Sequence, residues 1–346
     1  MNKLRVAVVG AGEFGKRHMR AVAQSSRADL AAVVDIDPAR AAEAAAAYSC
    51  EILPDAGGLA GRVDAAVVAV PTTAHVEIAG VLLDAGIDVL VEKPIAPDLA
   101  SAQRLVEKAE TLGRVLQVGH LERFNPAVTA LCKVVRLPLF FEIHRLSTFT
   151  PRSLDVDVVL DLMIHDIDVV LSLVGRMPEE IRAAGISILS RKVDLANVRL
   201  AFPGGCVANL TASRVSTERV RKLRLFQPHC YLSLDYSRQE VFSFGVTEDR
   251  QISSNALVVE RDEPLRLELE SFFECVETRS APRVTGRDAC RALEVALRIT
   301  AGIAEHAGIV AQSLSGDTGL NVSPVTGQQA PAPEAPGRPA KGFGKA

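Results

Sequence analysis

The chain of 346 residues lacks the patterns that mark metal-binding, membrane-spanning and nucleic-acid-binding proteins. Its six cysteines are scattered and form no C-x-x-C pair, which argues against a structural zinc site and against a disulfide framework. No apolar run reaches the roughly 18 residues that a membrane span needs. Basic residues form no long run and the formal net charge is −3, so nothing indicates binding to nucleic acid or to an acidic membrane surface. We therefore expect a cytoplasmic protein with reduced thiols and no structural metal.

The rest of the composition is that of an ordinary soluble globular protein, with 48% hydrophobic and 23% charged residues. A chain of this length can form two domains. Residues 4–120 alternate short apolar runs of β type with helix-length segments, which is typical of a parallel sheet covered on both faces. We therefore predict a doubly wound α/β domain over residues 1–121. Its strand candidates are LRVAVVG, LAAVVD, VDAAVVAV, IDVLVE and RVLQVG.

In the second part of the chain the alternation of strands and helices ends, and strand candidates follow one another closely. Such a series predicts an α+β domain with a largely antiparallel sheet, over residues 122–311. Residues 312–346 are rich in Pro, Ala and Gly and poor in large apolar groups, which predicts a disordered tail. The helical segments expected in the second domain are 126–136, 156–174, 266–279 and 287–307.

A glycine motif directly follows the first strand candidate, in the stretch VAVVGAGEFG. Gly10, Gly12 and Gly15 have the G-x-G-x-x-G spacing, which permits a tight turn, close approach of backbone to a pyrophosphate, and close helix packing. The next strand candidate ends in Asp35, where a carboxylate can bond the adenosine ribose diol and repels a 2′-phosphate. We expect a dinucleotide site that prefers NAD to NADP, although Arg40 is placed where it could approach a 2′-phosphate.

Two later strand candidates end in polar residues, at the edge where an open α/β sheet binds its ligand. VDAAVVAV continues into PTTAH, and IDVLV continues into EKP. Lys93 stands out because it directly follows a buried strand candidate, although a solvated surface lysine, the usual situation of this residue, is the structural alternative. We expect His75 to orient this loop. The residues at this edge are Pro71, Thr72, His75, Glu92 and Lys93.

The stretch DLMIHDID places ionisable groups at helical spacing among apolar ones. Asp161 and His165 lie four residues apart, so an α-helix would put them on one face, where the carboxylate could orient the imidazole; Asp168 could do the same from the next turn. A metal site is a weaker alternative, since no cluster of His or Cys joins these three. A helix-start acid and a buried histidine are the purely structural alternative.

Together these segments resemble one family of enzymes. GAGEFGKRH, PTTAH, EKP, GHLERFNP and DLMIH, in this order, are similar to the Gfo/Idh/MocA family of nicotinamide-dependent oxidoreductases, and the similarity covers residues 3–310. The resemblance implies a Rossmann domain followed by an α+β domain built on an open, mainly antiparallel sheet. The expected cofactor-binding residues are Gly10, Gly12, Glu13, Phe14, Gly15, Asp35, Pro71, Thr72, His75, Glu92, Lys93 and Arg123.

The resemblance also implies catalytic roles for Lys93, Asp161 and His165 beside the nicotinamide. Lys93 would reach the reacting oxygen, and Glu92 would lie near the nicotinamide ribose. Oxidation of a secondary alcohol removes a proton as well as a hydride, and a histidine with a pKa of about 6.5 can accept the proton near neutral pH. The sequence leaves open whether Lys93 or His165 is the base.

Substrate is harder to predict, because members of this family act on inositols, free sugars, nucleotide sugars and other alcohols. The segments QVGHLERFNPAV, FEIHRLSTFTPRSLDVDVVLDLMIHDID and LTASRVSTERVRKLRLF are most similar to the subgroup that oxidises the 3-hydroxyl of UDP-N-acetylglucosamine. In that subgroup an aminotransferase takes the 3-keto product toward a 3-amino sugar for lipid A or surface polysaccharide. The alternatives are an inositol or free-sugar dehydrogenase, and a noncatalytic dinucleotide-binding regulator, which would be expected to lack Lys93 or the Asp161/His165 pair.

Five arginines near these segments suit an anionic substrate, since guanidinium groups bind pyrophosphate well. Arg145 and Arg152 flank the polar loop STFTP, and Arg214, Arg219 and Arg221 are close together in the chain. Solvation or pairing with acids is the alternative, which we favour for Arg219 and Arg221. The expected substrate-binding residues are Lys93, Arg152, Asp161, His165 and Arg214.

Two expectations concern other parts of the chain. Arg123 and Asn125 in ERFNP either position cofactor or substrate or form a helix start, with Asn125 capping before Pro126. The antiparallel sheet should leave a broad face that needs covering, which predicts a homodimer or homotetramer.

Overall fold

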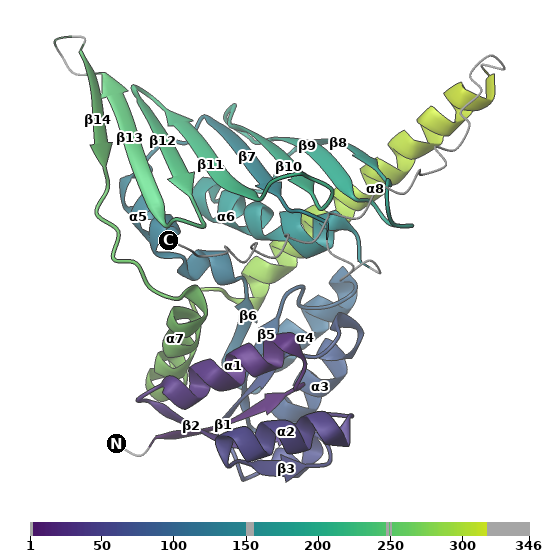
Figure 1. Cartoon of the computed structure of the whole chain (residues 1–346), viewed down its shortest axis with the longest axis vertical. Helices are drawn as coiled ribbons and strands as arrows, with labels where there is room; N and C mark the ends of the chain where they lie inside the picture. Colours follow the sequence, from purple (N-terminus) through teal and green to yellow (C-terminus); the bar gives the residue numbers. More distant parts are fainter. Residues whose placement is uncertain (1–2, 150–155, 247–248, 250, 317–346) are drawn as a thin grey trace, which may run out of the picture. The chain divides into compact units, whose positions relative to one another are not determined.

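The computed structural model describes residues 3–149, 156–246, 249 and 251–316 (Figure 1). Of the described residues, those up to Ala307 form one compact unit that contains both β-sheets, and those from Gly308 belong to a second unit. The domain boundaries predicted at 121 and 311 stay predictions.

The first sheet has six parallel strands in the order β3-β2-β1-β4-β5-β6, the strand order of a Rossmann domain. Its central strands are runs of Val and Ala with exposures close to zero, because helices cover both faces of a parallel sheet. All six strands point the same way, so their carboxyl ends meet at one edge. The strands are β1 (Leu4–Val9), β2 (Ala28–Val34), β3 (Glu51–Leu53), β4 (Ala65–Val68), β5 (Asp88–Glu92) and β6 (Leu116–Gly119).

Helices connect these strands and start directly beyond the carboxyl edge. Asp37 caps α2 by accepting hydrogen bonds from the next two amides after Pro38, and Asp98 caps α4 through Ser101. These caps fix where each helix begins and therefore which residues remain in the loops at the edge. The connections are α1 (Glu13–Gln24), α2 (Pro38–Tyr48), η1 (Gly57–Leu59), α3 (Thr72–Asp84) and α4 (Leu99–Thr111).

The second sheet has eight strands in the order β14-β13-β12-β11-β7-β10-β9-β8. Every neighbouring pair is antiparallel except β7 and β10, which run parallel. Burial alternates along strands such as β9 and β11, as expected for a sheet with one covered face. The strands are β7 (Phe140–Leu146), β8 (Glu180–Ile186), β9 (Leu195–Ala201), β10 (Val207–Ser213), β11 (Val220–Gln227), β12 (Cys230–Asp235), β13 (Glu240–Val246) and β14 (Ile252–Ala256).

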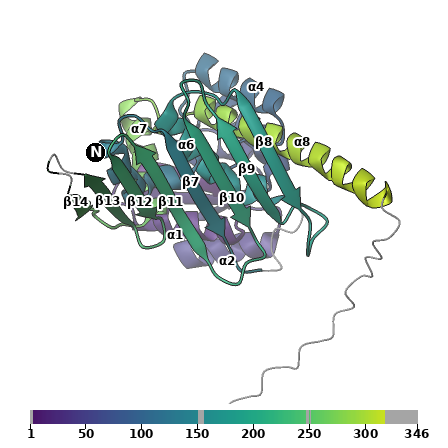
Figure 2. The ribbon, with the colours of Figure 1, turned by 90° about the horizontal axis from the view of Figure 1, so that it is seen from above.

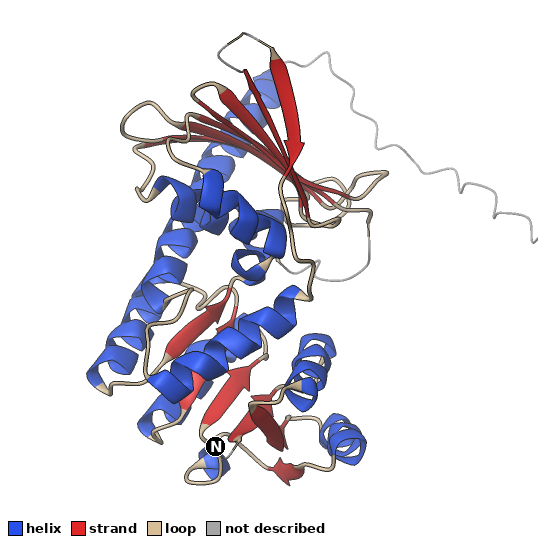
Figure 3. Ribbon diagram, turned by 90° about the vertical axis from the view of Figure 1, so that its left-hand side faces the viewer, coloured by secondary structure: helices blue, strands red, loops and turns tan. Residues whose placement is uncertain are grey.

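Helical segments cover one face of this sheet, here called the inner face. They are η2 (Leu121–Phe124), α5 (Pro126–Val134), the π-helix η3 (Val159–Met163), α6 (Ile164–Val174) and the part of the last helix that contains Ala292 and Ile303. Figures 2 and 3 show the helices on one side of the strands, and no helix within described residues 3–307 crosses the outer face. The inner core joins sheet residues such as Phe141, Ile143 and Leu223 to Met163 and Ile167.

The last two helices, α7 (Pro264–Thr278) and α8 (Gly286–Gly316), follow the second sheet in the chain. The apolar side of α7 nevertheless packs on the first sheet, where Leu269, Phe272 and Phe273 share a core with Val8 and Leu90. The first core therefore includes residues from the far end of the chain. None of the described helices is long and apolar enough to cross a membrane.

The predicted fold class is confirmed, and five details differ from the sequence expectation. β7, near the middle of the second sheet, was not expected, and neither were the short β3 and the edge strand β14. The helix expected over 156–174 begins as a π-helix. α8 continues past residue 312 to Gly316, while the rest of the predicted tail lies outside the described residues.

Candidate functional site

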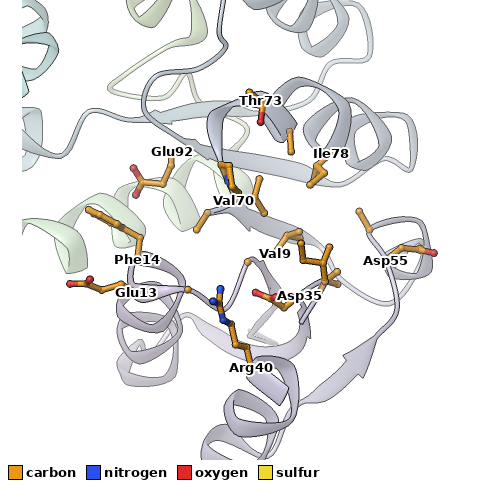
Figure 4. A pocket seen from close by; sticks show the side chains of 18 of the residues that line it. Val9, Glu13, Phe14, Asp35, Arg40, Asp55, Val70, Thr73, Ile78 and Glu92 are labelled. Atoms are coloured by element: carbon orange, nitrogen blue, oxygen red, sulfur yellow. The ribbon is translucent and has the colours of Figure 1, made fainter. Parts of the chain in front are cut away.

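A cleft of about 650 Å³ lies at the carboxyl edge of the first sheet (Figure 4). The ends of β1, β2, β4 and β5 and the loop after β3 line it, as the strand-end rule predicts. Eight of the predicted cofactor residues are in its wall: Gly10, Gly12, Glu13, Phe14, Asp35, Pro71, Glu92 and Lys93.

Glycine is required at two positions of the turn between β1 and α1. Gly10 has a φ of +100°, and a Cβ there would lie 2.4 Å from the Ala69 carbonyl oxygen. A Cβ on Gly15 would lie 1.8 Å from the Gly10 carbonyl oxygen. By contrast, a Cβ on Gly12 would meet no protein atom within 4 Å. The turn therefore leaves open space at Gly12, where backbone and the start of α1 can approach a pyrophosphate, and this fits a dinucleotide.

Asp35 is held firmly at the wall of the cleft. Its Oδ2 accepts a hydrogen bond from the Ala11 amide at 2.5 Å and its Oδ1 accepts one from the Asp37 amide at 2.8 Å. Figure 4 shows Asp35 and Arg40 at the same end of the cleft. Arg40 is paired with Asp37 at 3.3 Å. A fixed carboxylate at this end fits the ribose diol of NAD.

Glu92 ends β5 and joins two neighbours at the other end of the cleft. Its Oε1 lies 2.7 Å from His18 Nε2, and its Oε2 accepts a hydrogen bond from the Lys93 amide at 3.2 Å. Burial opposes ionisation of Glu92, but His18 and the charge of Lys93 together hold its pKa below the usual value. Glu268 of α7 is completely buried near Glu92, and burial and the charge of Glu92 raise the pKa of Glu268 well above its usual value.

Lys93 extends from the cleft to the layer of the second sheet. Its Nζ donates a hydrogen bond to the main-chain oxygen of Asp161 at 2.7 Å and lies 3.4 Å from the Asp161 carboxylate. Its side chain is only 12% exposed, so the alternative of a solvated surface lysine is wrong. Lys93 and the DLMIH segment were expected to act together, and they are in contact although they lie far apart in the sequence.

The expected pairing of Asp161 with His165 does not occur among the described contacts. Asp161 lies in the π-helix η3, whose wider turn breaks the α-helical spacing on which the expectation depended. The contacts of Asp161 go to Lys93, and His165 Nδ1 is buried without a hydrogen-bond partner. Asp168, expected on the other side of His165, instead pairs with Arg123 at 3.4 Å.

His165 stands beside a second buried histidine, His120. Their rings meet edge to face at 6.4 Å, and neither ring nitrogen of His120 has a hydrogen-bond partner among the described residues. Burial and then the charges of Lys93, Arg145 and Arg221 lower the pKa of His165 well below its ordinary value. Burial also lowers the pKa of His120, against the charge of Asp168. Both imidazoles are therefore neutral at pH 7.

The arginines divide differently from the sequence expectation. Arg145, expected to face an anionic substrate, is completely buried; its Nε and Nη2 contact Asp166 at 2.7 and 2.8 Å, and its Nη1 contacts Glu122 at 3.0 Å. Arg214 is also buried, and it donates to the Val156 carbonyl at 2.5 Å and lies 3.9 Å from Asp194. Its predicted role with substrate stays a prediction. Arg152 lies outside the described residues.

Four predicted cofactor residues do not line the cleft: Gly15, Thr72, His75 and Arg123. His75 is buried, with its ring nitrogens 2.9 Å from the carbonyl oxygens of Val70 and Pro94, so it holds the loop as expected. The cleft contains Thr73 in place of Thr72. Asn125 caps α5 by accepting from the Ala127 amide, which confirms the helix-start interpretation for Asn125.

Several residues of the cleft were not expected from the sequence. Most of them are apolar residues next to predicted positions. The ends of the strand candidates were the sequence feature that could have indicated them. The loop after β3 gave no signal, because a strand of three residues has no periodicity to detect. The additional lining residues are Val9, Val34, Ile36, Pro54, Asp55, Ala56, Ala69, Val70, Thr73, Ala74 and Ile78.

Comparison with known proteins agrees with this geometry. Residues 4–120 match the model of the oxidoreductase family with an NAD-binding Rossmann fold, and residues 104–227 match the Gfo/Idh/MocA C-terminal domain. The chain is 34% identical to a UDP-N-acetylglucosamine 3-dehydrogenase from Acidithiobacillus ferrooxidans, over 88% of this chain and 98% of that protein. A solved structure of that enzyme superposes with a TM-score of 0.83.

A second relative has a different activity. An inositol 2-dehydrogenase from Rhizobium meliloti is 26% identical, over 87% of this chain and 97% of that protein. The family models, the near full-length identity and the cleft with its glycine turn and acidic strand end lead to one conclusion: the chain belongs to the Gfo/Idh/MocA family of oxidoreductases and uses NAD.

Proposed function

We propose that this protein oxidises the 3-hydroxyl of UDP-N-acetylglucosamine to the 3-keto sugar, with NAD as the hydride acceptor. The observation that carries the oxidation chemistry is the position of Lys93, which lines the cofactor cleft and contacts the segment that holds His165. Support for the substrate comes from the near full-length similarity to the Acidithiobacillus enzyme of that activity.

The cofactor would be held along the cleft by the glycine turn, Asp35 and Glu92. When bound there, it accepts the hydride that leaves the alcohol carbon. The chain itself must take the hydroxyl proton and stabilise the oxygen. We assign the proton to His165, because its lowered pKa keeps the imidazole neutral and it lies in the segment that Lys93 contacts. Lys93, bound to two acceptor oxygens of Asp161, would donate a hydrogen bond to the alkoxide oxygen as its charge develops.

Purified protein with NAD and a panel of alcohols tests the proposal. The panel contains UDP-N-acetylglucosamine, its galacto epimer, myo-inositol and glucose, each with a carbonyl trap because alcohol oxidation is often uphill near neutral pH. The expected result is NADH absorbance together with a nucleotide sugar two hydrogens lighter by mass spectrometry. NADH with inositol or glucose alone would contradict the nucleotide-sugar assignment and favour the second candidate, an inositol dehydrogenase, which the Rhizobium relative supports. NAD binding without any turnover would favour a noncatalytic regulator.

Two partners follow from this proposal. The ketone product is the substrate class of an aminotransferase, so we propose that such an enzyme consumes it.

We also propose that a second copy of the chain covers the outer face of the second sheet, making a homodimer or homotetramer. An aromatic row crosses four strands there, with neighbouring ring centroids 4.8 to 5.8 Å apart, and a monomer by light scattering at micromolar concentration would contradict this. The row consists of Phe140, Phe226, Tyr231 and Phe244.

A further inference from the structure

Two arginines stand side by side on the inner face of the second sheet. Strands β7 and β11 are antiparallel neighbours, and Arg145 is paired directly with Arg221 in their register. Two residues farther along each strand, Ile143 is paired with Leu223, and both are buried in the inner core. Because side chains alternate along a strand, both arginines share the face of Ile143 and Leu223. Arg221 is thus directed toward the helical layer that contains His165.

The two arginines differ in their partners. Arg145 takes both oxygens of Asp166 and one oxygen of Glu122, and the other oxygen of Glu122 accepts from the Asn125 side chain. All four carboxylate oxygens near Arg221 are therefore already bonded. The side chain of Arg221 makes no hydrogen bond to any described residue, and its Nε is buried without a partner. Arg221 as a whole is half-buried. A buried guanidinium nitrogen such as this Nε normally has an acceptor, because an unpaired buried donor is costly.

Arg221 is also close to the proposed catalytic base. Its charge is one of those that lower the pKa of His165, and it lies near Arg145 and Arg219 as well. Burial and these like charges lower the pKa of Arg221 to about 10, so the side chain remains charged at pH 7. A permanent cation with unused donors, next to the base, is suited to an anionic group of the substrate.

We propose that Arg221 binds the diphosphate of the nucleotide-sugar substrate and thereby selects a nucleotide sugar over a free sugar or cyclitol. This inference rests on the proposed function and adds the residue that decides the substrate class. Arg145 and Arg214 are already committed to partners within the protein, and Arg219 is exposed to solvent. A myo-inositol molecule carries no anion for Arg221 to bind.

Calorimetric titration of the NAD-saturated enzyme with UDP tests this assignment, together with the KM for UDP-N-acetylglucosamine. In Arg221→Gln we expect UDP affinity to fall, and KM to rise, by about 10- to 100-fold, as for loss of hydrogen bonds to a charged group. NAD affinity should not change. Arg221→Lys, which keeps the charge but not the fork, should lie between the Gln variant and the unmodified enzyme. Arg221→Met keeps the apolar length of the side chain and replaces the Gln variant if that variant does not fold.

A matched control is Arg224→Gln, on the same strand but on the outer face, where Arg224 is exposed and bonds Glu142. It should bind UDP as the unmodified enzyme does. If the unmodified enzyme oxidises UDP-N-acetylglucosamine and the Arg221 variants retain full UDP affinity, the role of Arg221 is wrong and the proposed function stands. If the unmodified enzyme neither binds UDP nor oxidises the nucleotide sugar, the proposed function is wrong and this inference falls with it.

Discussion

The cofactor cleft and the layer around His165 hold their polar groups by different means. In the cleft, main-chain groups position the polar side chains. Asp35 accepts hydrogen bonds from two amides, and carbonyl oxygens lie so close to the turn that glycine is required there. Around His165, side chains from distant segments hold one another, as in the group of Arg145, Asp166 and Glu122. The first arrangement depends on neighbours within a short motif, whereas the second depends on how three elements pack together.

The largest expected effects come from residues where the two regions meet. His165→Ala should lower kcat by about 10²- to 10⁴-fold, since it removes the proposed base. Lys93→Ala should lower kcat by about 10²- to 10³-fold, since it removes the donor to the developing charge. Stopped-flow measurement of NADH formation gives kcat, and NAD titration should show nearly unchanged affinity. Two variants with full activity would show that the catalytic assignment is wrong.

Removing a member of the side-chain group should affect stability before chemistry. Arg145→Gln leaves Asp166 and Glu122 buried without their common partner, so we expect a loss of about 3 to 5 kcal/mol in the free energy of unfolding. Denaturant titration measures this loss, with the exposed Arg224→Gln as the control. Unfolding at the same denaturant concentration as the unmodified protein would show that the group is not needed for folding.

Two glycine substitutions in the turn should separate folding from cofactor binding. Gly15→Ala forces its Cβ onto the Gly10 carbonyl and should cost about 1 to 3 kcal/mol of stability. Gly12→Ala meets no protein atom, so its melting temperature should be preserved while NAD affinity falls, because the Cβ occupies the space left for the pyrophosphate. Thermal melts without and with NAD measure both quantities. Equal NAD affinity in Gly12→Ala would place the pyrophosphate elsewhere.

The smallest expected effect is a dependence of stability on pH. Burial lowers the pKa values of His75, His120 and His165 in the folded state, so the unfolded chain binds protons more readily. Above pH 6.5, roughly the pKa of histidine in the unfolded chain, these residues are neutral in both states and cost no stability. As the pH falls below about 6.5, the unfolded chain takes up protons first and the free energy of unfolding decreases. Melting temperatures between pH 7.5 and 5 measure this loss. A His120→Gln variant, which cannot titrate there, should lose less than the unmodified protein.

The sequence allowed prediction of the cofactor cleft more fully than of the substrate side. Gly10, Gly12 and Asp35 could be placed because their roles depend on spacing within one β-α-β unit. Asp161 and His165 could be placed near Lys93, but their mutual contact was wrong, because spacing does not reveal an extra residue in a helical turn. Arg145 was misjudged because its partners come from other elements, and β7 was missed because Arg145 is a charged residue at a buried position of the strand.

The packing of α7 on the first sheet bears on the order of events during synthesis. Phe272 and Phe273 complete a core whose strands lie within the first 92 residues, so a nascent chain exposes that apolar surface until translation has passed residue 273. The core of the first sheet is therefore completed only after the strands of the second sheet have been synthesised, because α7 follows them in the chain. A truncation after residue 121 would leave the same surface exposed, because it removes α7.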